Sequence, residues 1–280
     1  MLGNLESKKR LDVYDFISPT SGTKNAAVRK SVLITRAGFG IRKHTAIHFA
    51  RAGASFIVLV GRTANDLESS NAKVLVEAPD CRAVCAPTDI SDPAAVSALF
   101  EKTGKIDILI NNAGTTGIIG PLTSVDLNKW WMAYEVNIRG TYLMASEFFK
   151  LLAGGPGVVL NISSRSSYVT APGMSAYQIS KSTLHRLTEF IDKEHGSQGV
   201  VAVAFHLGGV PGTKVAHAAP EWLPALPAST ALYLMLPRAK YLSGRFINAQ
   251  WDIEKLETHR ERIISEDLPK MRVLGIDDQL

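Results

Sequence analysis

Short apolar runs alternate with longer amphipathic segments along most of the chain from Ser31 onward. The apolar runs carry hydrophobic residues at consecutive positions, which is typical of strands buried on both faces of a parallel sheet. The runs interpreted as strands cover residues 32–34, 56–60, 83–85, 106–110, 158–160 and 200–205. The segments with helical spacing cover residues 42–52, 64–77, 93–102, 126–152 and 175–195. The pattern predicts an α/β fold, a single doubly wound parallel sheet with helices on both faces.

The composition of the chain predicts an N-terminal arm followed by one domain. Residues 1–30 are polar and rich in turn residues, so we expect an N-terminal arm that lies on the surface or caps a partner subunit. Residues 31–280 show no break or long linker and are predicted to form one domain. Within it, residues 211–227 contain several prolines around Trp222, and this segment is either an apolar lid over the site or an ordinary crossover loop.

Composition and charge exclude several classes of protein. With 280 residues, 46% hydrophobic and 20% charged, the chain is of ordinary globular composition. Its net charge of +5 is scattered, so we expect no nucleic-acid partner but a small anionic ligand. No run reaches the roughly 18 apolar residues of a membrane span, and a secretory signal is not evident, so we expect no membrane partner and a cytoplasmic location.

The two cysteines and one histidine pair suggest neither a disulfide nor a metal site. Cys81 and Cys85 fall in one predicted strand about 13 Å apart, too far to bridge, and are expected to be buried thiols in a reducing compartment. His44 and His48 are spaced for one helix face, but no glutamate lies between them as in a zinc protease, and we expect no metal.

Polar and glycine residues follow the predicted strands. In a doubly wound sheet, ligands bind beyond the carboxyl ends of the strands, where the strand order reverses. The segments at these ends are residues 35–42, Gly61 and Arg62, Asp89, residues 111–114, Ser163 and Ser164, and residues 207–213. They are expected to line one long crevice.

Tyr177 and Lys181 lie four residues apart at the start of a predicted helix and therefore project from the same face. A cation within about 4 to 6 Å favours the phenolate form of a tyrosine, which makes Tyr177 a candidate general acid or base. Ser164, at the same edge, could hold a substrate oxygen near Tyr177. The alternative is that Tyr177 is an ordinary helix aromatic and Lys181 a solvated side chain.

A wider pattern surrounds this pair. The residues Asn111-Asn112-Ala113-Gly114, Asn137, Ser164, Tyr177 and Lys181, in this order and at these intervals, resemble the short-chain dehydrogenase/reductase family. The resemblance extends from about residue 31 to 252 and implies a Rossmann-like fold and an oxidoreductase. The stretches 243–246 and 251–252, with Trp130 and Trp131, resemble a fungal branch that often acts in secondary metabolism.

The resemblance implies a role for each catalytic candidate. Tyr177 would exchange the proton and Ser164 would orient the reacting oxygen. Lys181 would assist Tyr177 and hold the nicotinamide ribose, while Asn137 would hold a water that continues the proton relay.

It also implies contacts with a dinucleotide cofactor. Asp89 would meet the adenine ring, and Asn111, Ala113 and Gly114 would pass beside the adenosine ribose. Thr213 would contact the nicotinamide carboxamide. Without a ligand, the Asn-Asn-Ala-Gly segment would be a turn that closes a strand.

The phosphate-binding loop departs from the family pattern T-G-x-x-x-G-x-G. The chain has Arg36 and Arg42 in place of the first and third glycines, and only Gly40 stands in register. The candidates for cofactor binding in this loop are Thr35, Arg36, Gly38, Gly40 and Ile41. The two guanidinium groups would either pair with the cofactor phosphates or occupy the space that the pyrophosphate needs.

The second predicted strand ends in Gly61-Arg62 and has no carboxylate there for the 2′-hydroxyl of NAD. An arginine at this position suits a 2′-phosphate, which predicts NADP(H) as the cofactor. The alternative is that Arg62 is only a solvated side chain at the end of a strand.

The leading hypothesis is an NADP(H)-dependent oxidoreductase acting on a ketone or secondary alcohol of a small, fairly apolar metabolite. The altered loop motivates an alternative, an isomerase, cyclase or dehydratase that uses Tyr177 and Ser164 without hydride transfer. A binding protein without activity is a third. Apolar positions on the helices 126–152 and 175–195, and pairing of related proteins there, predict a homodimer or homotetramer.

Overall fold

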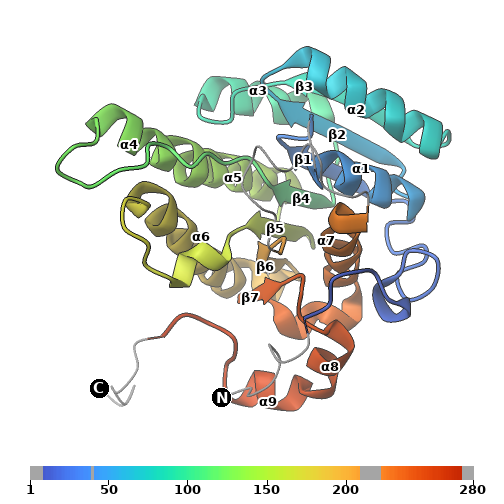
Figure 1. The fold of residues 1–280 in the computed structure, drawn as a ribbon. Coiled ribbons are helices and arrows are strands. Elements are labelled where there is room, and N and C mark those ends of the chain that lie inside the picture. The colour runs from blue at the N-terminus through green and yellow to red at the C-terminus, as the bar shows by residue number, and fades with distance from the viewer. Residues whose placement is uncertain (1–8, 39–40, 209–221, 273–280) are drawn as a thin grey trace.

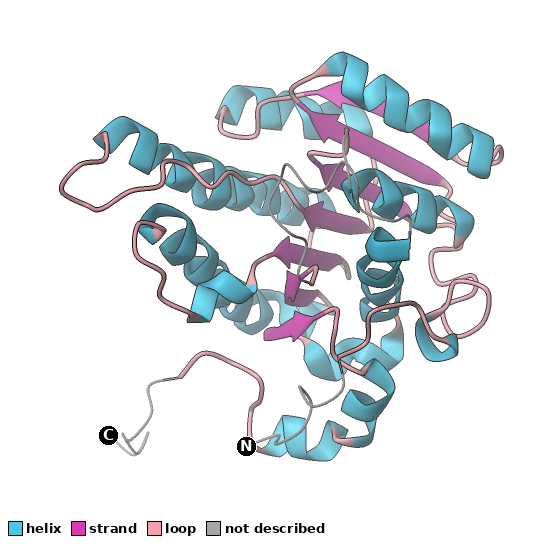
Figure 2. Ribbon diagram, in the orientation of Figure 1, coloured by secondary structure: helices cyan, strands magenta, loops and turns pink. Residues whose placement is uncertain are grey.

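The computed structural model describes residues 9–38, 41–208 and 222–272. Within them, seven strands form one sheet in the order β3-β2-β1-β4-β5-β6-β7, and every neighbouring pair is parallel (Figure 2). The strands are β1 (Ser31–Thr35), β2 (Phe56–Gly61), β3 (Arg82–Pro87), β4 (Ile108–Asn111), β5 (Val158–Ile162), β6 (Val201–His206) and β7 (Arg245–Asn248). The predicted doubly wound parallel sheet is confirmed.

Helices cover both faces of this sheet (Figure 1). The helices are α1 (Ile41–Arg51), α2 (Ala64–Glu77), α3 (Pro93–Thr103), α4 (Leu127–Tyr134), α5 (Thr141–Leu152), α6 (Ser175–His195), α7 (Trp222–Leu234), α8 (Ile253–Thr258) and α9 (Arg260–Ser265). On one face α1 packs against α2 and α7, and on the other α3 packs against α5 and α4 against α6.

The central strand β1 shows why the strands are apolar at consecutive positions. All five of its residues are buried. Val32 and Ile34 belong to the core under α1 and α7, whereas Leu33 belongs to the core under α3 and α5. Since successive side chains of a strand point to opposite faces, a sheet covered on both sides needs apolar residues at every position.

The strand order reverses beside β1. The chain runs outward from β1 through β2 to β3 and then returns to place β4 on the other side of β1. The loops after β1 and β4 therefore diverge to opposite faces, and a crevice opens between them at the carboxyl edge.

The predicted helix over 126–152 is interrupted. Six residues, Glu135–Gly140, form a π-helical turn that separates α4 from α5. A Cβ on Gly140 would lie 2.7 Å from Cδ1 of Ile90, so only glycine allows this approach. The turn contains the buried Asn137, and such turns often occur at functional sites.

The N-terminal segment contributes to the core. Ile17 is fully buried, and the hydroxyl oxygen of Tyr14 accepts a hydrogen bond of 2.6 Å from the backbone N–H of Ile253. Arg10 forms an ion pair of 2.6 Å with Asp252. The segment 9–30 is thereby fastened to the C-terminal part of the domain.

Two details differ from the sequence-based expectation. Cys81 precedes β3 and only Cys85 lies within it; both are free, and burial raises the pKa of each thiol to about 11. Of the segment 211–227, residues 222–227 begin α7 and the rest lie outside the described residues.

Among the described helices none is both long and apolar enough to cross a bilayer.

Candidate active site

Thr35, the last residue of β1, joins the two loops that flank the crevice. Its Oγ1 accepts hydrogen bonds of 2.8 Å from the backbone N–H groups of Asn112 and Ala113. The side-chain amide of Asn112 donates in turn to the carbonyl oxygen of Thr35 at 3.2 Å. Thr35 therefore fixes the segment after β4 against the end of β1.

The side chain of Asn111 points into the protein. It is buried, and its Nδ2 donates to Oδ1 of Asn161 at 3.0 Å, while Asn161 donates to Oγ1 of Thr188 on α6 at the same distance. Any contact of Asn111 with a cofactor would have to come from its backbone. Its side chain instead ties β4 and β5 to α6.

Asn137 lies in the π-turn and is fully buried. Its Oδ1 accepts from the backbone N–H of Thr115 at 2.8 Å. Its Nδ2 donates to the carbonyl oxygen of Thr115 at 2.9 Å and to Oγ of Ser180 at 2.8 Å. Both amide protons of Asn137 are thus used inside the protein, where they hold the segment after Gly114 against α6.

Tyr177 and Lys181 lie one turn apart on α6, as predicted. Nζ of Lys181 is 5.9 Å from the centre of the Tyr177 ring. Lys181 is only 4% exposed. The ammonium donates to the carbonyl oxygen of Ile162, at the end of β5, at 2.6 Å. A Cβ on Gly114 would lie 3.3 Å from this Nζ, so a glycine gives the ammonium room at the crevice.

Ser164 follows β5 and caps a short 3₁₀ turn, Arg165–Tyr168. Its Oγ accepts from the backbone N–H of Ser166 at 3.1 Å. That bond uses the hydroxyl as an acceptor and leaves its proton for another oxygen. The 3₁₀ turn packs against α6, which keeps Ser164 at the same edge as Tyr177.

A buried histidine supports this arrangement and was not found by sequence reasoning. Oγ of Ser163 donates to the carbonyl oxygen of Lys181 at 2.9 Å and lies 2.8 Å from Nε2 of His185. Because the serine has one proton, Nε2 of His185 must be the donor in the second bond. His185 stacks on Phe246 with ring centres 4.7 Å apart, and burial lowers its pKa to about 4. The four-residue spacing from Tyr177 through Lys181 to His185 is the signal that could have revealed it.

A pocket of about 440 Å³ lies over the carboxyl ends of β1 to β4, and Gly114 contributes to its lining. Its lining includes Arg36, Arg62, Asp89, Ala113 and Gly114, all of which were predicted to bind a cofactor. Hydrogen bonds from Ser91, and the charge of Arg62, hold the pKa of the Asp89 carboxyl below its usual value. The pocket combines charged groups of both signs with glycine and alanine backbone, as a site for a polar ligand requires.

Arg36 extends across the crevice. It directly follows β1 with a left-handed φ of 54°, and its Nη1 donates to the carbonyl oxygen of Gly114. Burial, and then the neighbouring charge of Arg62, lower the pKa of its guanidinium, whereas Tyr177 raises it. Arg36 therefore lies within electrostatic reach of both the pocket and the catalytic candidates.

Gly38 is the described glycine of the loop that follows β1. A Cβ on Gly38 would lie 2.6 Å from Cβ of Asp66, so Gly38 allows close packing of the loop on α2. Gly40 and Thr213 lie outside the described residues, as do the side chains of Ile41 and Arg42.

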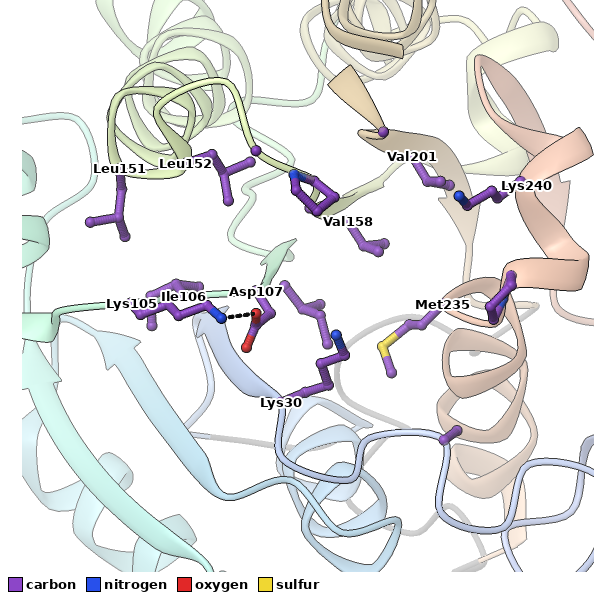
Figure 3. A pocket seen from close by; sticks show the side chains of 17 residues that line it. Lys30, Lys105, Ile106, Asp107, Leu151, Leu152, Val158, Val201, Met235 and Lys240 are labelled. Carbon is purple, nitrogen blue, oxygen red and sulfur yellow. Dashed lines mark ion pairs between the residues drawn. The ribbon is translucent and has the colours of Figure 1, made fainter. Parts of the chain in front are cut away.

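A second pocket, of about 460 Å³, lies at the opposite edge of the sheet (Figure 3). Lys30, Lys105 and Lys240 contribute to its lining, and Nζ of Lys105 is 3.3 Å from the carboxylate of Asp107. None of the predicted site residues that the structure describes lines it. The candidate chemistry is therefore gathered at the carboxyl edge.

Comparison with known proteins assigns the chain to a family. The model of the short chain dehydrogenases matches residues 30–224. The chain belongs to the short-chain dehydrogenase family. The short chain dehydrogenase citE of Monascus ruber is 34% identical over 285 residues, which cover 96% of each chain. The short chain dehydrogenase andI of Emericella variicolor is 32% identical over 92% of this chain and 96% of that relative.

Solved structures agree with this assignment. A 7α-hydroxysteroid dehydrogenase complexed with NADH and 7-oxo glycochenodeoxycholic acid has a TM-score of 0.73 and 26% identity, covering 82% of this chain and 96% of that one. A 3-ketoacyl-(acyl-carrier-protein) reductase from Brucella melitensis complexed with NADH has a TM-score of 0.67 and 27% identity, covering 79% and 97%. This short-chain dehydrogenase is an oxidoreductase of a family that binds a nicotinamide cofactor.

We expect the buried histidine of this dehydrogenase to make its stability depend on pH. The pKa of His185 falls from 6.5 to about 4 on folding, so between these values the unfolded chain binds the additional proton. The free energy of unfolding must then decrease as the pH falls through this window, with His185 contributing about 2 kcal/mol between pH 7.5 and pH 5.

Urea unfolding of the parent and of His185→Gln at both pH values measures this effect. The variant should lose about 2 kcal/mol less on acidification than the parent. His195→Gln, a change of the same type at the partly exposed end of α6, serves as the control and should behave as the parent. An equal loss in His185→Gln and the parent would show that His185 is not buried in its neutral form.

Proposed function

We propose that this dehydrogenase interconverts a ketone and a secondary alcohol on a small, largely apolar metabolite, with NADP(H) as its cofactor. The observation that carries the proposal is the buried ammonium of Lys181, held between Ile162 and Gly114 and within 6 Å of the Tyr177 ring, beside a pocket of about 440 Å³. That juxtaposition supports a proton-exchanging role for Tyr177 close to a bound dinucleotide.

The residues present fit such a cofactor. Arg62 and Asp89 would hold its adenosine end, the backbone of Ala113 and Gly114 would pass beneath the ribose, and Lys181 would hold the nicotinamide ribose. Gly114 supports this fit because any side chain there would crowd Lys181. When bound, the cofactor supplies or accepts the hydride.

The chain's own residues supply the proton and the orientation. In the reducing direction Tyr177 gives its phenolic proton to the carbonyl oxygen of the substrate, and in the oxidising direction it takes the hydroxyl proton. The Ser164 hydroxyl, whose proton is not used in its bond with Ser166, donates a hydrogen bond to that same oxygen. Lys181 stabilises the phenolate that Tyr177 becomes after it has given up its proton.

The relatives of this dehydrogenase support the proposed substrate class. The 7α-hydroxysteroid dehydrogenase was solved with a ketone on a largely apolar steroid body. The curated relatives come from Monascus, Emericella and Aspergillus, and are likewise short chain dehydrogenases. They support a fungal natural-product intermediate as the substrate.

A second candidate function has one observation in its favour. Arg36 crosses the crevice where a dinucleotide would lie and bonds to Gly114. If the side chain stayed there, Tyr177 and Ser164 would retain acid-base chemistry without hydride transfer, as an isomerase, cyclase or dehydratase requires.

Replacing Tyr177 with phenylalanine removes the proton-exchanging group and nothing else. We expect kcat to fall at least about 100-fold while NADPH affinity stays within about twofold of the parent. Steady-state rates and calorimetric titration measure the two quantities. Tyr142→Phe, which removes a hydroxyl from an exposed tyrosine on α5, should leave both unchanged. Near-normal turnover of Tyr177→Phe would exclude Tyr177 from the mechanism.

The choice of cofactor should depend on Arg62. Loss of a charge-assisted contact to the 2′-phosphate, worth about 1.5 to 3 kcal/mol, predicts that Arg62→Ala binds NADPH about 10- to 100-fold more weakly. NADH, which has no 2′-phosphate, should bind as it does to the parent. Arg82→Ala, which removes an exposed arginine at the start of β3, is the control for charge. Equal effects on the two cofactors would contradict NADP(H) selection by Arg62.

We also propose that the protein forms a homodimer or homotetramer through the outer faces of α5 and α6. Tyr142 on α5 is 57% exposed, and Ile179 and Phe190 on α6 are 47% and 53% exposed. Exposed large apolar side chains favour self-association. Light scattering should give two or four chains, and Phe190→Lys should lower the mass. Ile264→Lys, at a comparably exposed position on α9, should not. A monomeric parent at micromolar concentration would refute the assembly.

A further inference from the structure

Arg36 separates the two halves of the crevice. It contributes to the lining of the pocket that also contains Arg62 and Asp89, whereas Tyr177 and Lys181 do not line that pocket. Its guanidinium donates to the carbonyl oxygen of Gly114, and a Cβ on Gly114 would lie 3.3 Å from Nζ of Lys181. The side chain therefore lies between the space for an adenosine and the catalytic group.

Its present hydrogen-bond acceptor is a poor match for a guanidinium. Nη1 donates to the neutral carbonyl oxygen of Gly114, and no ion pair of Arg36 occurs among the described residues. Desolvation, and then the like charge of Arg62, act on the guanidinium and lower its pKa. A cation in such surroundings is stabilised by an anion, and a guanidinium that is exposed at the crevice can bind phosphate oxygens with two parallel hydrogen bonds.

The backbone of Arg36 also directs it to this position. Its φ of 54° is left-handed, a conformation in which glycine is preferred, and it turns the side chain toward the segment after β4. The contact that glycine would provide through close approach of the backbone can here come only from the side chain.

We propose that Arg36 binds the diphosphate of the dinucleotide, and that it does so by exchanging the carbonyl oxygen of Gly114 for phosphate oxygens. This inference rests on the proposed function, because it presupposes a nicotinamide dinucleotide. The exchange connects the pocket with Tyr177, since the side chain that divides the crevice becomes part of the ligand contact. Arg36 thus acts on NADPH and NADH alike, unlike Arg62.

Calorimetric titrations of the parent and of Arg36→Gly with NADPH, NADH and adenosine 2′-monophosphate test the exchange. The last probe has the 2′-phosphate but lacks the diphosphate. We expect Arg36→Gly to bind both dinucleotides about 10- to 100-fold more weakly at low salt, and the nucleotide monophosphate within about twofold of the parent. The difference should shrink between about 50 mM and about 300 mM salt, because salt screens the contact.

Arg29→Gly is a matched control. Arg29 also has a left-handed φ, of 58°, and is exposed outside the pocket, so this variant should bind every probe as the parent does. Thermal unfolding checks that each variant is folded. If Arg36→Gly does not fold, Arg36→Gln replaces it, because a neutral side chain able to bond to Gly114 should weaken dinucleotide binding in the same direction.

Three results would overturn the inference. Unchanged or tighter dinucleotide binding by Arg36→Gly would mean that Arg36 is indifferent or obstructive, while the proposed cofactor would stand. Binding of the monophosphate but of no dinucleotide by the parent would mean that Arg36 keeps the crevice closed. Binding of no probe by the parent would remove the proposed function and the inference together.

Discussion

A buried ammonium is the constraint on which the rest of the site depends. Lys181 is 4% exposed, and a buried cation is costly unless oxygen atoms surround it. Its partner is the carbonyl oxygen of Ile162, which must therefore remain at a fixed distance from α6. Ser163 maintains that distance through the carbonyl oxygen of Lys181, and Gly114 leaves the ammonium room toward the crevice. The hydrogen bonds of Asn137 to Thr115 fix the segment that contains this glycine.

Much of the fold was predictable because local pattern and tertiary burial agree. The helices α2 and α6 have the predicted bounds, and the first six strands fall within one or two residues of their apolar runs. The strand β7 and the helices after it were missed, since a four-residue run with Arg245 at its start has no clear strand pattern. The π-turn Glu135–Gly140 was missed because its buried residues, Asn137 and Gly140, give no apolar pattern that would set it apart from the flanking helices.

The site was predictable to the extent that it follows from spacing. The i, i+4 spacing of Tyr177 and Lys181 places them on one helix face, and the structure agrees. The direction of Arg36 could not be predicted, because it depends on a left-handed backbone that sequence does not normally give to arginine. The inward side chains of Asn111 and Asn137 depend on partners more than twenty residues away, which a motif does not reveal.

We propose that Tyr177 exchanges a proton while a hydride passes between NADP(H) and a carbon of the substrate. Incubation of the enzyme with NADPH carrying two deuterium atoms at C4 of the nicotinamide, and with a panel of apolar ketones, tests this directly by mass spectrometry of the products. We expect an alcohol with one deuterium on the carbinol carbon and one NADPH consumed for each product. A product that forms without deuterium and without loss of NADPH would contradict it and would favour isomerisation or dehydration at the same residues.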